Sequence, residues 1–155
     1  MFNVKKCIMK QVQINGISEF LRGIQLGKVS DKDTKVKLAK IYLVLHKKAE
    51  EFSNDIKEFQ KKFFEGKEED IQKHDELVRQ LQNAKEEEKA ELESKIDPEI
   101  TELIKDFNNA VQEMLNKDVE VSFDKLSEDK LIEALIDLEI EFTGNDLSVL
   151  KDLYE

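Results

Sequence analysis

A ladder of apolar residues runs through the first half of the sequence, with spacings that alternate between four and three. It consists of Leu38, Tyr42, Leu45, Ala49, Phe52, Ile56, Phe59 and Phe63. Residues at this spacing lie along one side of a helix and form a seam against which a second helix packs. The ladder therefore predicts a long helix with a helical partner. It carries no reactive group, so it says nothing about chemistry.

The residues around the ladder predict where this helix begins and ends. Ser30 and Asp31 are good N-cap residues, and neither Gly nor Pro interrupts the stretch up to about Glu65. Gly66 is the first plausible hinge. We therefore expect one helix of about 35 residues.

The segment before the long helix is less regular. Apolar residues at helical spacing that end at Gly27 predict a short helix near residues 15–26. Residues 2–14 mix β-branched residues with Lys and Gln. Either a short strand or the start of a helix is compatible with them.

The middle of the chain is dominated by charge. Sixteen of the 29 residues in segment 67–95 are charged, and few apolar residues are available for a core. Strong helix formers with almost no apolar face are typical of a helix exposed to solvent. We expect this segment to form the charged tip of a helical hairpin, and a dedicated docking surface is the alternative interpretation.

A second apolar ladder follows the charged segment. Asp97 and Pro98 suit the N-cap and first turn of a new helix. The ladder that follows consists of Ile100, Leu103, Phe107, Ala110 and Met114. Two seams of the same period, joined by a reversing segment, predict an antiparallel coiled-coil hairpin over residues 31–117.

Beyond Lys117 the apolar period changes from helical to alternating. The stretches 119–123 and 138–142 both alternate apolar with polar residues, which predicts two half-buried strands that pair in a small sheet. Each is followed by a candidate cap, Ser127 or Asn145, and by a leucine, Leu131 or Leu150, at the same offset of nineteen residues. We interpret residues 118–155 as a strand–helix repeat. A chance likeness between two amphipathic stretches is the alternative.

The C-terminal half carries a family resemblance. The stretch FNNAVQEMLNKDVEVSFDKLSEDKL, followed by LEIEFTGNDLSVL, resembles the end of a family of small uncharacterised proteins from tailed bacteriophages, especially siphoviruses. The resemblance covers about residues 30–155, although segment 67–95 is longer than the corresponding middle part. It implies a viral origin and a small helical accessory protein, and it offers no catalytic residues.

Composition and charge indicate the general class. The chain has 155 residues, a length typical of a single domain, with 1–30 as an N-terminal strand and short helix before the hairpin. Cys7 is the one cysteine, so no disulfide forms within the chain. No apolar stretch is long enough to cross a bilayer. We expect a soluble, intracellular, mainly α protein.

The net charge of −10 is unevenly distributed. Residues 1–48 contain eleven Lys and Arg against three Asp and Glu, so the remaining 107 residues carry −18. We expect the basic part to face acidic segments of the same chain. Nucleic-acid binding is the alternative, but the lysines (Lys28, Lys32, Lys35, Lys40 and Lys47) lack interleaved aromatic residues or a recognition-helix pattern.

Sequence motifs for catalysis or metal binding are absent. His46, His74 and Cys7 do not approach zinc-ligand spacing, and there is no glycine-rich phosphate loop. Glu102 and Asp106 share a helical spacing that is typical of a solvated face. Cys7 is read as a small core residue rather than a reactive thiol. We predict no enzyme activity, catalytic residue, metal, cofactor or small-molecule substrate.

Three function classes follow from these observations. The first is a non-enzymatic structural or protein–protein interaction protein of a phage, acting in virion assembly or as a virion accessory component. The second is an acidic regulator that binds a host protein as a nucleic-acid mimic. The third is nucleic-acid binding through residues 1–48. The first is preferred, with a protein partner or a second copy of the chain, in the host cytoplasm, and with the virion as the alternative location.

Overall fold

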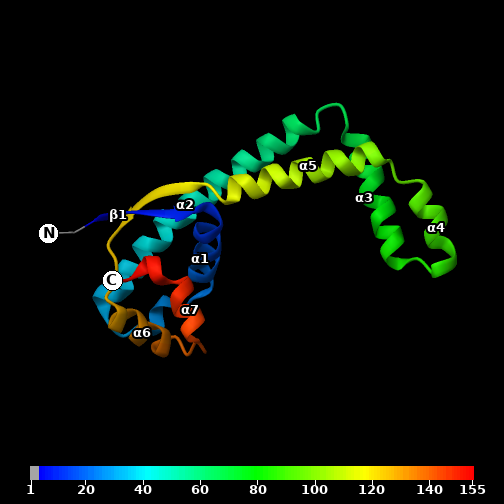
Figure 1. Ribbon diagram of the computed structural model, residues 1–155. Helices are drawn as coiled ribbons and strands as arrows, with labels where there is room; N and C mark the ends of the chain where they lie inside the picture. Colours follow the sequence, from blue (N-terminus) through cyan, green and yellow to red (C-terminus); the bar gives the residue numbers. More distant parts are fainter. Residues whose placement is uncertain (1–3) are drawn as a thin grey trace. The chain divides into compact units, whose positions relative to one another are not determined.

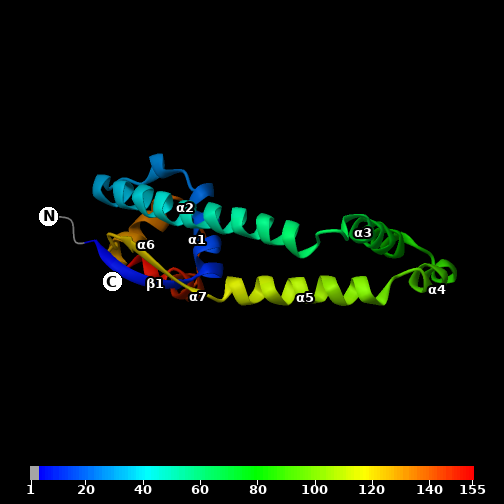
Figure 2. The same cartoon turned by 90° about the horizontal axis from the view of Figure 1, so that it is seen from above.

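The computed structural model describes residues 4–155 and is mainly α-helical, with a small two-stranded antiparallel sheet (Figures 1 and 2). This confirms the predicted fold class. The chain forms two compact units, one made of residues up to Ser53 together with Leu115–Glu155, and the other of Asn54–Met114. A division into compact units does not establish whether they unfold separately, so the single domain stays a prediction.

The first unit contains the sheet and most of the short helices. Its elements are β1 (Lys5–Lys10), α1 (Gln11–Gly23), η1 (Leu26–Lys28), the beginning of α2 (Lys32–Phe63), β2 (Asp118–Phe123), α6 (Glu128–Asp137), α7 (Gly144–Val149) and η2 (Lys151–Leu153). Of the predicted segment 2–14, residues 2 and 3 lie outside the described part, and residues 5–14 form a strand that is followed at once by a helix. Helix α1 begins earlier than the predicted range 15–26, directly after β1. It also ends earlier, at Gly23, because the backbone of Ile24 is extended.

The sheet joins the N-terminal segment to the segment that follows α5. Strands β1 and β2 are antiparallel, with Lys5 opposite Phe123 and Lys10 opposite Asp118. Just beyond the last pair of the sheet, the backbone N–H of Gln11 donates a hydrogen bond of 3.0 Å to the carbonyl of Lys117. The first of the two predicted strands is thus confirmed, but its partner comes from the N-terminus.

The predicted strand at 138–142 is wrong. Helix α6 ends there in a tight turn in which Glu139 has a φ of 56°. The N–H of Ile140 donates to the carbonyl of Leu135 at 3.2 Å, and that of Glu139 donates to Ile136 at 3.0 Å. These bonds form a Schellman motif. Leu138 is buried, and Ile140 and Phe142 are half-buried, so their alternation reflects burial around a turn instead of a strand.

Of the two predicted helix caps in the C-terminal region, one is confirmed and the other is wrong. Ser127 caps α6, because its Oγ accepts a hydrogen bond from the N–H of Lys130 at 3.2 Å, as predicted. Asn145 is not a cap. Thr143 takes that role, and its N–H donates to the carboxylate of Asp146 at 2.7 Å. The repeat is therefore two capped helices, of which the first alone follows a strand.

Helix α2 begins as the sequence predicts. The carboxylate of Asp31 accepts hydrogen bonds from the N–H and the Oγ1 of Thr34, at 2.9 and 2.7 Å. One face of α2 is buried through Leu38, Ile41 and Leu45. These residues belong to the hydrophobic core of the first unit, which also contains buried residues of α1, β1, β2, α6 and η2.

The second unit is an antiparallel helical hairpin. The end of α2 and the returning helix α5 (Pro98–Leu115) run in opposite directions (Figure 1). Phe107 of α5 contacts three aromatic rings at centroid distances of 5.5 Å for Phe59, 5.6 Å for Phe63 and 4.9 Å for Phe64. In this unit the two apolar ladders therefore meet as predicted. Gly66, with a φ of 79°, forms the turn after α2.

Segment 67–95 forms two helices, α3 (Glu68–Asn83) and α4 (Glu86–Ser94). Neither helix contains a buried residue. The prediction of a thinly buried helical tip is confirmed, and the chain reverses at Ala84 and Lys85 between the two helices. Pro98 follows in the first turn of α5, with the carboxylate of Asp97 accepting from the N–H of Glu99 at 2.9 Å.

Candidate interaction surfaces

The residues considered for chemistry are dispersed. Within residues 4–155, no group of three or more His, Cys, Asp and Glu side chains could hold a metal ion. The ring of His46 stacks on Tyr42 at 5.1 Å and lies 3.2 Å from a carboxylate oxygen of Glu50. His74 lies on α3, and Cys7 is buried in the sheet of the first unit. The structure does not bring these side chains together.

Shifted pKa values arise from structural contacts within the first unit. Burial, followed by the nearby carboxylate of Asp152, raises the pKa of the Cys7 thiol. Hydrogen bonds from the backbone and side chain of Ser30, at 2.8 and 2.7 Å, lower the pKa of Asp137. The corresponding bonds from Thr34 lower the pKa of Asp31. These carboxylates join segments of the fold, and none lines either of the cavities described below.

The basic N-terminal segment is partly neutralised within the chain. Four of its lysines pair with carboxylates from residues 118–155: Lys5 with Glu155 at 2.6 Å, Lys6 with Glu120 at 3.1 Å, Lys10 with Asp118 at 2.8 Å and Lys28 with Glu139 at 2.9 Å. Internal pairing is therefore confirmed for β1 and η1. These four pairs do not involve the lysines of α2.

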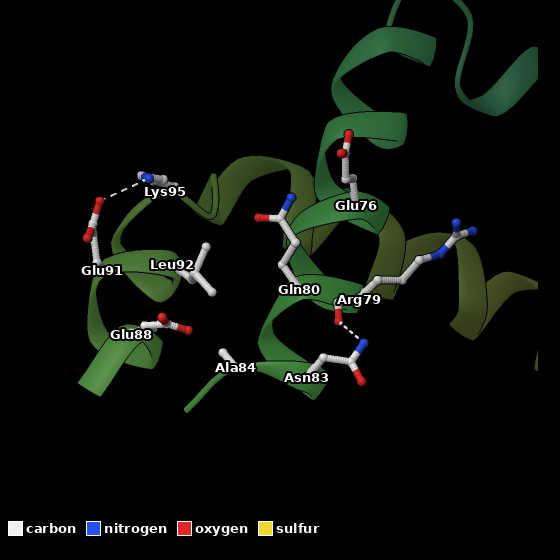
Figure 3. Close-up of a pocket in the computed structure, with 9 residues that line it drawn as sticks. All are labelled: Glu76, Arg79, Gln80, Asn83, Ala84, Glu88, Glu91, Leu92 and Lys95. Carbon is white, nitrogen blue, oxygen red and sulfur yellow. Dashed lines mark hydrogen bonds and ion pairs between the residues drawn. The ribbon is translucent and has the colours of Figure 1, made fainter. Parts of the chain in front are cut away.

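The second unit has an open groove between α3 and α4. The groove has a volume of about 740 Å³, and it is lined by Glu76, Arg79, Gln80, Asn83, Ala84, Glu88, Glu91, Leu92 and Lys95. Figure 3 shows Leu92 projecting from α4 toward α3, whereas Arg79 extends away from α4. The groove follows from two helices that lack the apolar residues needed to close against each other.

The lining of this groove is polar and of mixed sign. Glu91 and Lys95 pair along α4 at 3.1 Å, and the side-chain amide of Asn83 donates to the carbonyl of Arg79 at 3.1 Å (Figure 3). Leu92 and Ala84 supply a small apolar strip between these groups. Such a surface suits a polypeptide better than a compact apolar ligand.

The first unit has a smaller and more apolar pocket of about 210 Å³. It is lined by Gly16, Ile17, Phe20, Leu135, Ile140, Glu141, Phe142, Asp146, Val149 and Leu150. Ile17, Leu135 and Leu150 are buried at its floor, and Val149 is 56% exposed at its rim. Both charged residues in the lining are carboxylates. Its volume lies below the range of about 300–1,000 Å³ typical of small-molecule sites.

The sequence does not predict this pocket, because it does not predict that Ile140 and Phe142 lie beside α1. The sequence predicts Ile140 and Phe142 within a half-buried strand at 138–142. The Schellman turn instead places them with Leu135 of α6 and with α1. The sequence signal for the pocket is Gly16, a glycine within a helical pattern, because it leaves the side of α1 that faces the pocket without a side chain.

Among residues 4–155, none of the helices combines the length and the apolar character needed to cross a membrane. No family model, curated protein or solved structure matches the chain.

Proposed function

We propose that this chain is a non-enzymatic structural or protein–protein interaction protein. Following the resemblance of its C-terminal half, we assign it to a tailed bacteriophage, where it acts in virion assembly or as a virion accessory component. It works in the host cytoplasm, and the virion is the alternative location. Its partner is a protein or a second copy of the chain.

The α3–α4 pair is the observation that supports this proposal best. The two helices have sixteen and nine residues and no buried side chain. Isolated helices of this length are marginal in water, and most helical stability in proteins comes from packing of an apolar face. Because α3 and α4 add little to a core, a binding role explains their presence better than a folding role. The groove between them gives a partner segment a place to pack.

A photo-crosslinking experiment in infected cells tests the proposal. A photoreactive amino acid replaces Gln80, whose side chain lines the groove, and the matched control replaces Lys57, which is exposed on α2 in the same unit. We expect a discrete covalent adduct from position 80 and none from position 57. The adduct is identified by mass spectrometry.

The identity of the adduct decides between the roles. A phage structural protein, together with the chain itself in purified virions, supports assembly or an accessory role. No adduct at position 80, or the same diffuse background at both positions, contradicts the proposed binding role of α3 and α4.

The charge distribution favours a second candidate, an acidic regulator of a host protein. The first turns of α3 and α4 present three carboxylates each, and all six belong to the part of the chain that carries −18. For this role the irradiation is repeated in lysate at low and at high salt. An adduct with a basic host protein whose yield falls at high salt supports it, because screening weakens exposed charge pairs before the crosslink forms. An adduct that forms in equal yield at low and at high salt argues for packing in the groove instead.

A further inference from the structure

The apolar pocket of the first unit has an opening that the fold itself does not require. Gly16 lies within α1, where glycine is less favourable than alanine. Its φ is not positive, and a Cβ placed there would meet no heavy atom within 4 Å. Neither backbone conformation nor close packing therefore explains the glycine. Its missing side chain leaves the wall of the pocket open.

The pocket also has an acidic rim. Glu141 forms no hydrogen bond or ion pair through its side chain with any residue in 4–155. Asp146 also lies in the lining, and its carboxylate accepts hydrogen bonds from the N–H and the Oγ1 of Thr143, at 2.7 and 3.0 Å. The pocket therefore suits a single large apolar side chain that is flanked by positive charge.

The same unit carries an exposed apolar strip on α2, formed by Val36 and Leu43, which we call the ridge. Leu43 is 64% exposed and Val36 is 43% exposed, although both lie on α2. They follow each other at a spacing of seven, on the side of the helix opposite the buried residues Leu38, Ile41 and Leu45. Core packing therefore does not account for Leu43.

Lysines flank Leu43 on the ridge. Lys40 and Lys47 stand three positions before it and four positions after it, so all three share one face of the helix. The side chain of Lys47 has no ion-pair or hydrogen-bond partner within residues 4–155. Leu43 and Lys47 thus match the apolar floor and the acidic rim of the pocket in both character and sign.

We propose that Leu43 of one copy of the chain inserts into the Gly16 pocket of a second copy, with Lys47 facing Glu141. Ridge and pocket are different surfaces of one unit, so the contact is heterologous and adds copies head to tail. The apolar insertion supplies affinity, and the charges supply register and association rate. This inference rests on the proposed function and names a second copy as the partner.

Sedimentation equilibrium of the full chain tests the contact. We expect the average mass of the wild type to rise beyond that of a dimer with concentration, in the micromolar to millimolar range. Leu43→Ser removes the ridge, and Gly16→Leu closes the pocket without a clash at Cβ. Each variant alone should associate at least about tenfold more weakly. The matched control is Ile136→Ser, an exposed apolar residue on α6 outside the pocket lining, and should leave association unchanged.

Mixing the two variants gives the decisive measurement. Leu43→Ser retains the pocket and Gly16→Leu retains the ridge, so the mixture should form a one-to-one complex and nothing larger. Glu141→Lys should weaken association, and Lys47→Glu in the same chain should restore it. A wild type that stays monomeric at millimolar concentration, or a mixture that stays monomeric, overturns the contact. That result leaves the α3–α4 proposal untouched, because the crosslink at position 80 tests it separately.

Discussion

At the scale of single residues, Glu139 shows how the C-terminal region is shaped. Its φ of 56° places an L-residue in the left-handed region, which glycine adopts without a steric cost. Glu139 lies in the Schellman turn that ends α6, in which the N–H groups of Ile140 and Glu139 donate to the carbonyls of Leu135 and Ile136. Its carboxylate also accepts a hydrogen bond from Lys28 at 2.9 Å. Because this ion pair is exposed, the backbone conformation should dominate the stability at this position.

Two substitutions separate the backbone from the ion pair. Glu139→Gly and Glu139→Ala both remove the carboxylate, but the glycine alone relieves the left-handed strain. We expect Glu139→Gly to unfold at a Tm about 3 °C above that of Glu139→Ala, as measured by circular dichroism. Equal Tm values for the two variants would contradict this account of the turn.

Asp31 makes a prediction about pH. Hydrogen bonds from Thr34, first through the backbone and then through the side chain, lower the pKa of Asp31 below its ordinary value of 3.8. A lowered folded-state pKa stabilises the fold above the ordinary value, and this contribution is lost as the pH falls through the lower, folded value. The wild type should therefore lose more stability on acidification than Asp31→Asn, which keeps an N-cap acceptor but does not titrate.

Urea unfolding at about pH 7 and about pH 3 measures this difference. Asp137 and Glu155 also have lowered pKa values and remain in both proteins, so their effects cancel in the comparison. Parallel losses of stability in the wild type and Asp31→Asn would show that the cap of α2 does not depend on the charge of Asp31.

At the scale of elements, one aromatic cluster joins the two long helices within the second unit. Phe107 is the residue of α5 that contacts the three rings from the end of α2 and the turn after it. Phe64 is buried and the others are half-buried, so the cluster brings apolar surface of these segments into direct contact. The shorter helices α3 and α4 add no buried residue.

Phe107→Ala should weaken this hairpin selectively. We expect a loss of about 2–3 kcal/mol, at or below the low end for a fully buried phenylalanine, because Phe107 is only half-buried. Hydrogen exchange should accelerate in α5 more than in α1 or α6. Phe107→Leu, which keeps most of the apolar volume, is the matched control and should lose less. Unchanged exchange in α5 for Phe107→Ala would contradict the proposed role of the cluster.

At the scale of the whole molecule, α2 belongs to both compact units. The helix runs from Lys32 to Phe63 while the division between units falls after Ser53. A continuous helix propagates order along its length because each further residue adds a hydrogen bond to an existing nucleus. We therefore expect the two units to unfold together.

The aromatic composition provides a test of this cooperativity. The chain has no Trp, and its two Tyr residues, Tyr42 and Tyr154, both lie in the first unit. Tyrosine fluorescence thus reports on the first unit, whereas far-ultraviolet circular dichroism reports on helices of both. We expect coincident urea midpoints for the two probes. A separate, earlier transition in circular dichroism alone would identify the second unit as an independent domain.

The sequence by itself determined the helical elements. The ladder from Leu38 to Phe63, the cap at Asp31, the turn at Gly66 and the restart at Pro98 are local features, and each depends on spacing or on the propensity of a few neighbouring residues. The charged tip was also predictable because too few apolar residues were present to bury it. These features need no knowledge of the rest of the chain.

Only the tertiary structure decided which segments meet. Stretches 119–123 and 138–142 have the same alternation, yet the first pairs with β1 and the second turns around Glu139, because alternation records burial on one side and not the presence of a hydrogen-bonded neighbour. The pocket beside Gly16 depends on that same turn, which brings Ile140 and Phe142 to α1. Contacts between residues more than a hundred positions apart are chosen by competition among similar apolar segments, and no local pattern contains that choice.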